Sequence, residues 1–123
     1  MDTLKEPYWA IENNKEYIYI DFQGVSDDSS VMNQVLKALE MGFARKDKSV
    51  RALLITRGGK TSPAAMRIIK VLGKKVQPKI KKSAVVGSVG ILSLLLKIYI
   101  AYTGSNMRFF TDEKKAINYL TID

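Results

Sequence analysis

The 123-residue chain contains no cysteine and no histidine. Without cysteine it can form no disulfide and offers no thiolate to a metal, which fits a reducing compartment, so we expect a cytoplasmic location. Without histidine it lacks the side chain that ordinarily exchanges protons near neutral pH. Its clustered acids, Asp21, Asp27 and Asp28, form no acid pair or metal-ligand spacing. The composition therefore predicts a protein that is not an enzyme and holds no metal or cofactor.

The chain also lacks a hydrophobic run long enough to cross a membrane. Its most apolar segment, residues 91–103, is interrupted by Ser93 and Lys97, whereas a spanning helix needs about 20 apolar residues. The first 14 residues are polar and acidic and do not resemble a signal peptide. With 46% hydrophobic residues, the sequence predicts one folded domain over residues 1–123 that is not transmembrane.

Acidic residues are missing from the whole middle of the chain. Residues 48–111 hold thirteen lysines and arginines and no Asp or Glu, whereas residues 1–47 hold nine carboxylates and five basic residues. Such a segment attracts nucleic acid, anionic lipid or an acidic protein surface, unless it is only a solvated face. No aromatic residue alternates with its densest part, which argues against stacking on single-stranded nucleic acid. The candidate anion-binding residues are Arg67, Lys70, Lys74, Lys75, Lys81 and Lys82.

What is present is a regular alternation of strand and helix patterns. Two strands, residues 8–11 and 17–22, flank Asn13 and Asn14, which tolerate the backbone of a tight turn, so they predict an antiparallel hairpin. Further strands are predicted at 50–55, 84–86 and 107–110, and helices after Asp27, after Ser62, at 91–103 and after Thr111. This order predicts an α/β fold with a mixed, mainly parallel sheet of four or five strands, an N-terminal hairpin and about four helices.

Several local motifs carry a resemblance to a known family. They are the strand and glycine at 22–27, the central strand and loop at 53–62, the strand at 84–87 and, most specific, the segment 109–116. Over residues 8–120 the chain resembles the STAS domains (sulfate transporter and anti-sigma-factor antagonist), especially their small stand-alone bacterial members. The resemblance implies a non-catalytic domain that binds a protein partner. Some relatives are suspected of binding hydrophobic or nucleotide ligands.

Ser62 has two alternative interpretations. In anti-sigma-factor antagonists, the loop before the second helix carries a phosphorylatable serine, and the resemblance places that position at Ser62 or at Thr61. Those domains usually have an aspartate before the serine, whereas this chain has Thr61. Ser62 followed by Pro63 is also typical of a helix start, with serine as the N-cap and proline in the first turn. The sequence does not decide whether Ser62 is a helix cap or a regulatory site, but it favours the cap.

The helix at 91–103 carries two apolar stripes where a surface helix normally has one. The first comprises Ile91, Leu94, Leu95, Ile98 and Tyr102, and the second Leu92, Leu96, Tyr99 and Ile100. We expect the second stripe to face away from the sheet and to form the interface of a homodimer with two-fold symmetry. The alternative is that the helix is simply well buried.

Together these observations predict a non-catalytic binding or regulatory module that acts through protein–protein contacts, with itself or with another protein. Two alternatives remain. The apolar helix also fits a carrier of a lipid or small hydrophobic ligand. The basic segment also fits a domain that docks on anionic membrane or nucleic acid.

Overall fold

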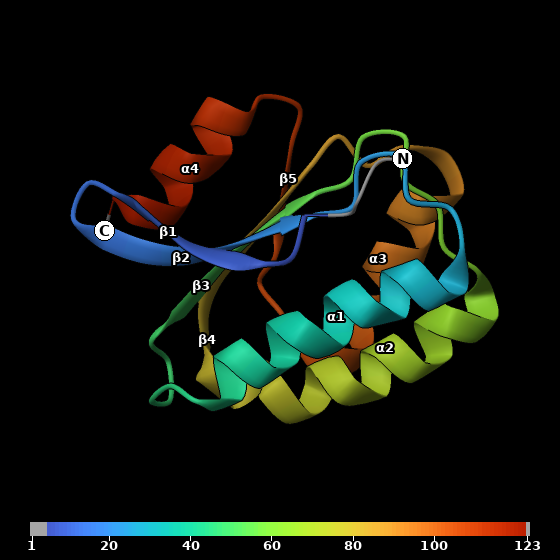
Figure 1. Cartoon of the computed structure of the whole chain (residues 1–123), viewed down its shortest axis with the longest axis horizontal. Coiled ribbons are helices and arrows are strands. Elements are labelled where there is room, and N and C mark those ends of the chain that lie inside the picture. The colour runs from blue at the N-terminus through green and yellow to red at the C-terminus, as the bar shows by residue number, and fades with distance from the viewer. Residues whose placement is uncertain (1–4, 123) are drawn as a thin grey trace.

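The computed structural model describes residues 5–122 and contains one five-stranded sheet in the order β1-β2-β3-β4-β5 (Figure 1). β1 is antiparallel to β2, and all other neighbours are parallel. The elements are β1 (Tyr8–Glu12), β2 (Lys15–Asp21), α1 (Asp28–Phe43), β3 (Val50–Ile55), α2 (Pro63–Val76), the 3₁₀ turn η1 (Gln77–Lys79), β4 (Ile80–Val86), α3 (Gly90–Thr103), β5 (Arg108–Phe110) and α4 (Glu113–Thr121). The predicted α/β architecture is therefore confirmed.

The turn of the β1–β2 hairpin is formed by the two asparagines. Asn13 and Asn14 have φ angles of 51° and 61°, a left-handed conformation that asparagine adopts more readily than most residues. Across the hairpin, the rings of Tyr8 and Tyr19 stack with their centroids 5.2 Å apart. The antiparallel hairpin predicted from the sequence is thus present.

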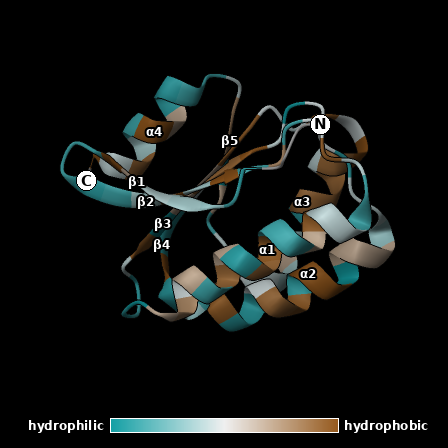
Figure 2. Cartoon of the chain, in the orientation of Figure 1, coloured by the Kyte–Doolittle hydropathy of each residue, from teal (hydrophilic) through white to brown (hydrophobic). Residues whose placement is uncertain are grey.

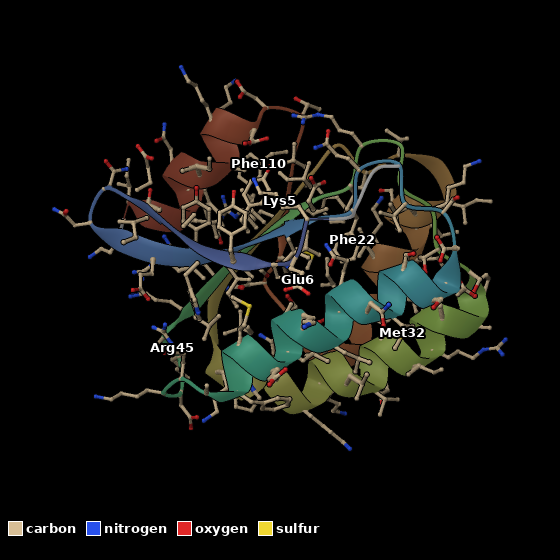
Figure 3. The ribbon with its side chains drawn as sticks, viewed as in Figure 1. Lys5, Glu6, Phe22, Met32, Arg45 and Phe110 are labelled. Atoms are coloured by element: carbon tan, nitrogen blue, oxygen red, sulfur yellow. The ribbon has the colours of Figure 1, made fainter. Side chains whose placement is uncertain are left out.

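The sheet separates two hydrophobic layers. Helices α1, α2 and α3 each connect neighbouring parallel strands, and all three cover one face (Figure 1), as expected when successive crossovers share one hand. No strand follows α4, and it packs on the opposite face. Phe22 lies on the α1–α3 side of the sheet and Phe110 on the α4 side (Figure 3). Figure 2 shows α3 mostly in the hydrophobic colour.

Three details differ from the sequence-based expectation. β4 begins at Ile80, so Lys81 and Lys82 lie within a strand and not in a loop before it. The N-cap of α4 is Asp112 in place of Thr111, because the Asp112 carboxylate accepts a hydrogen bond from the Lys114 amide at 2.9 Å. The third difference is the rotation of α3, described below. In the described part of the chain, no helix has the length and apolar character needed to span a membrane.

Candidate functional site

The most distinctive feature of the molecule is an apolar pocket of about 150 Å³ between the sheet and helices α1–α3, which is partly open to solvent and is called the cavity below. Protein interiors are normally packed with few voids larger than a water molecule. The walls are almost entirely apolar. The floor comes from the sheet, with Ile18, Ile20, Ala52, Leu54 and Ile80, and the roof from the helices, with Val35, Ala38, Leu39, Met66, Ile69, Leu92, Leu96 and Tyr99.

Small residues in both layers around the cavity help to account for this space. Ala38 and Gly42 lie on the inner side of α1, and Ala52 and Ser83 lie on the strands beneath. Core layers fill their volume when a small residue opposes a large one, but here small side chains occur in both layers. The cavity is therefore a property of this sequence, but the sequence alone does not show that these positions face each other.

One end of the cavity is polar. Lys60 and Thr61, in the loop between β3 and α2, line it together with Thr56. The Thr56 hydroxyl donates to the Val86 carbonyl at 2.9 Å. The Thr61 hydroxyl is buried and has no hydrogen-bond partner among the described residues, although a buried unpaired hydroxyl costs about 1–3 kcal/mol.

Glycines shape the loop that forms this polar end. Gly58 has a φ of +69°, the left-handed conformation that favours glycine. A Cβ on Gly59 would lie 2.6 Å from the Phe22 carbonyl oxygen and 3.1 Å from that of Thr56. The chain can therefore bring Lys60 and Thr61 over the end of the cavity only because position 59 has no side chain.

Ser62 caps α2, as predicted. Its hydroxyl accepts a hydrogen bond from the Ala65 amide at 3.0 Å and donates to the Asp28 carboxylate at 2.8 Å. The second bond joins the N-terminus of α2 to that of α1, where Asp28 is in the first turn. Thr61, the other candidate for modification, has its hydroxyl buried, so a modifying enzyme could not reach it in this conformation.

The six basic candidates do not form one cluster. Arg67, Lys70, Lys74 and Lys75 lie on α2, and Lys81 is exposed on β4. Lys82 lies on the opposite face of the sheet, where its ammonium donates to the carbonyls of Tyr119 and Ile122 at the end of α4. Lys82 is therefore separated from the basic residues of α2, because strand alternation turns its side chain toward α4.

The expectation about α3 was also wrong. Leu96 is 6% exposed, and Leu92 and Tyr99 pack with it against the sheet. The exposed stripe is the other one, with Ile91, Leu94, Ile98 and Tyr102. The rotation of α3 is decided by α2, since Gly73 leaves room for the ring of Tyr99 at the contact between the two helices. Of the four residues predicted as a homodimer interface, Leu92, Leu96 and Tyr99 are therefore covered within the domain, whereas Ile100 is partly exposed.

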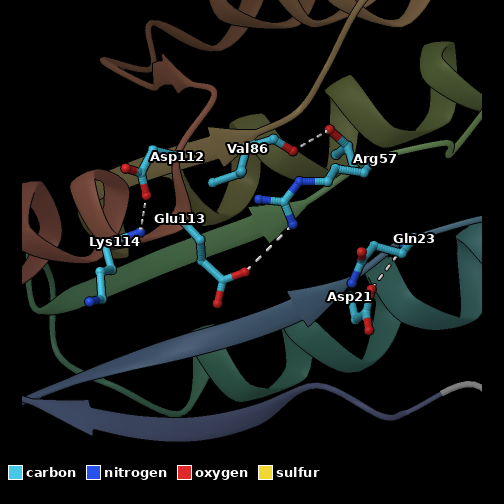
Figure 4. Close-up of polar contacts among 8 residues, drawn as sticks. Asp21, Gln23, Arg57, Val86, Asp112, Glu113 and Lys114 are labelled. Carbon is cyan, nitrogen blue, oxygen red and sulfur yellow. Dashed lines mark hydrogen bonds and ion pairs between the residues drawn. The ribbon is translucent and has the colours of Figure 1, made fainter.

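A separate polar group lies at the carboxyl ends of the strands (Figure 4). Arg57 and Glu113 form an ion pair at 3.7 Å, and the Asp21 carboxylate accepts a hydrogen bond from the Gln23 amide at 2.9 Å. Burial, with a smaller effect from Glu113, raises the pKa of Tyr19 to about 12. At neutral pH this hydroxyl is protonated and can donate a hydrogen bond, but it cannot act as a base.

The arrangement shows no constellation for acid–base or nucleophilic catalysis, and the described residues contain no group of three acidic side chains that could hold a metal ion. Burial also raises the pKa of Tyr99, whose ring lines the cavity. What the interior offers is an apolar space with hydroxyl groups at its edge.

Comparison with known proteins places the chain in a family. The model of the SpoIIAA-like family matches residues 17–121. The chain belongs to the SpoIIAA-like family. This confirms the resemblance to STAS and anti-sigma-factor antagonist domains predicted from the sequence.

A solved structure shares the whole architecture. It is an uncharacterised protein of the DUF3478 family from Shewanella loihica PV-4, described as having a SpoIIAA-like fold, with a TM-score of 0.72 and 19% sequence identity over 98% of each chain. At this identity the likeness shows the fold alone. A comparison with curated proteins found no match.

Proposed function

We propose that this protein is a non-catalytic binding module that holds a small apolar molecule in the cavity between the sheet and helices α1–α3. The observation that carries the proposal is the cavity itself, about 150 Å³ with almost entirely apolar walls. An apolar space on the order of 150 Å³ accommodates a molecule of about the size of benzene. A ligand would restore the dispersion contacts that the lining side chains lack.

The polar end of the cavity adds a preference within this class of ligand. Lys60 lines this end of the cavity and favours a ligand with one hydrogen-bond acceptor. A phenol or a small apolar acid has this property. A purely apolar molecule fills the space but leaves the Lys60 ammonium without a contact from the ligand.

The cavity can be tested with small aromatic probes. We expect toluene and phenol to shift the NMR signals of the Ile, Leu and Val methyl groups that line it, with dissociation constants on the order of 0.1–1 mM, or about 4–5 kcal/mol. The Ala38→Leu variant should fill the space and abolish binding of both probes. The matched variant Ala64→Leu changes an exposed alanine of α2 and should bind them as the wild type does.

The polar end has its own control. Lys60→Met should weaken phenol binding about fivefold, because the hydrogen-bond donor at this end is lost, and should leave toluene binding unchanged. Absence of saturable methyl shifts with either probe, or binding that persists in Ala38→Leu, would overturn the proposal.

A second candidate function is regulation of a protein partner through the N-terminus of α2. The specific observation is the Ser62–Asp28 hydrogen bond, which joins the first turns of α1 and α2 at the molecular surface. A negatively charged group on Ser62 could no longer donate a hydrogen bond to Asp28 and would repel its carboxylate. Modification at this position would therefore change the contact between α1 and α2 and alter the surface that a partner meets.

The Ser62 contacts make a prediction about stability. Ser62→Ala should cost about 1 kcal/mol, because the cap of α2 is lost. Ser62→Asp keeps a capping oxygen but opposes Asp28, so it should cost about 0.5–1 kcal/mol at low salt. The double variant Ser62→Asp with Asp28→Asn should regain the stability that Ser62→Asp loses, as measured by urea unfolding. Equal stability of Ser62→Asp and the wild type at low salt would show that the two side chains are not coupled.

A further inference from the structure

The outer face of α3 exposes large hydrophobic side chains in a continuous stripe. Val89, just before the helix, is 76% exposed, and Ile91, Leu94 and Ile98 are 72%, 59% and 47% exposed. Positions 91, 94 and 98 recur at the spacing of one helical face. The opposite side of the helix packs on the sheet through Leu95 and Leu96, so the exposed stripe contributes nothing to the described core.

Basic side chains run along one border of this stripe. Arg67, Lys70 and Lys74 lie on one side of α2, three and four residues apart. That side faces α3, because the ammonium groups of Lys70 and Lys74 are each 4.8 Å from the centre of the Tyr102 ring. Tyr102 continues the exposed stripe one turn beyond Ile98. The stripe is therefore bordered by positive charge over its second half.

Negative charge is missing from the two helices that form this surface. Neither α2 nor α3 contains an aspartate or glutamate, and α3 adds one more cation, Lys97. An apolar strip with cations on its flank and no anions matches the two properties of an anionic lipid surface, an acyl layer beneath negatively charged headgroups.

The charge pattern argues against a second copy of the chain as the occupant. A two-fold interface brings the same patch of both copies together, so a second copy would offer the basic side of α2 no acidic side chain from α2 or α3. We propose that the outer face of α3, with the basic side of α2, docks on an anionic lipid bilayer. This inference is independent of ligand binding in the cavity, which involves the inner face of α3.

Sedimentation with vesicles tests the proposal. The full chain is mixed with vesicles of phosphatidylcholine alone or with 30 mol% phosphatidylserine. We expect binding to the anionic vesicles at 50 mM salt, little binding to the neutral ones, and a steep loss of binding at 300 mM salt. The double variant Lys70→Gln with Lys74→Gln should bind about fivefold more weakly per lysine removed.

The apolar stripe has a matched control. Leu94→Glu with Ile98→Glu should reduce vesicle binding more than tenfold, whereas Leu36→Glu, on an exposed position of α1, should bind as the wild type does. Unchanged circular dichroism and an unchanged midpoint of urea unfolding would show that both variants are folded.

Three results would overturn the proposal. They are no binding of the wild type to anionic vesicles at 50 mM salt, full binding by the Leu94→Glu, Ile98→Glu variant, and binding that is equal for neutral and anionic vesicles. Analytical ultracentrifugation identifies the competing occupant. A wild-type dimer that dissociates in the Leu94→Glu, Ile98→Glu variant would assign the stripe to self-association in place of a membrane.

Discussion

Gly73→Ala is expected to destabilise the protein by about 2 kcal/mol, although alanine is the better helix former by about 1 kcal/mol. Gly73 is buried in the interior of α2, and a Cβ there would lie 2.5 Å from Cε2 and 2.6 Å from Cζ of the Tyr99 ring. The ring is rigid and held between α2 and α3, so it cannot yield as a flexible side chain would. Overpacking of this kind typically costs 1–3 kcal/mol, and the clash outweighs the gain in helix propensity.

A second glycine provides the control for this prediction. Gly42 is buried in α1, and a Cβ there would meet only Cγ2 of Val76, at 3.2 Å, so Gly42→Ala should be within about 0.5 kcal/mol of the wild type in chemical denaturation. Adding Tyr99→Leu to Gly73→Ala should remove the clash and recover part of the loss. If Gly73→Ala stabilises the protein, the close approach of Tyr99 to α2 is wrong.

Leu120→Ala is expected to have the largest effect, a loss of about 3–4 kcal/mol in the free energy of unfolding. Leu120 is fully buried on α4, which is the only helix of the described chain on its face of the sheet. A nine-residue helix has little stability of its own, so its attachment depends on Leu120 and Ala116. Removing the larger of these side chains leaves a cavity that no neighbouring helix can fill.

The matched variant for this prediction is Ile122→Ala, because Ile122 follows α4 and is 59% exposed. It should change the stability by less than 0.5 kcal/mol. In the fraction of Leu120→Ala that stays folded, toluene should bind as in the wild type, since the cavity lies on the other face of the sheet. A loss below 1 kcal/mol for Leu120→Ala would mean that α4 contributes little to the fold.

The two faces of α3 separate the two binding proposals. The inner face, with Leu92, Leu96 and Tyr99, lines the cavity, and the outer face carries the exposed stripe that ends at Tyr102. A module with this arrangement would place an apolar ligand one helix diameter from an apolar surface. Because the tests use different probes and different variants, either proposal can fail without the other.

Local sequence signals determined most of the architecture. The asparagines at 13 and 14 placed the hairpin, Ser62 with Pro63 placed the start of α2, and Gly104, with its φ of +75°, ended α3 as a left-handed cap should. These features depend on backbone preferences and hydrogen bonds within a few residues, and such preferences can be read from one chain. Alternation of strand and helix patterns then predicted the mixed sheet.

Only the tertiary structure decided which side of α3 is buried and where the interior is hollow. Both stripes of α3 are hydrophobic, so periodicity could not choose between them, and the choice depends on Gly73, which is 26 positions before Tyr99 in the chain. The cavity likewise depends on Ala38 of α1 and Ala52 of β3 lining the same space. Strand alternation places Lys82 on the α4 side of the sheet, away from the basic residues of α2. Each outcome is set by contacts between segments far apart in sequence, which a local pattern does not encode.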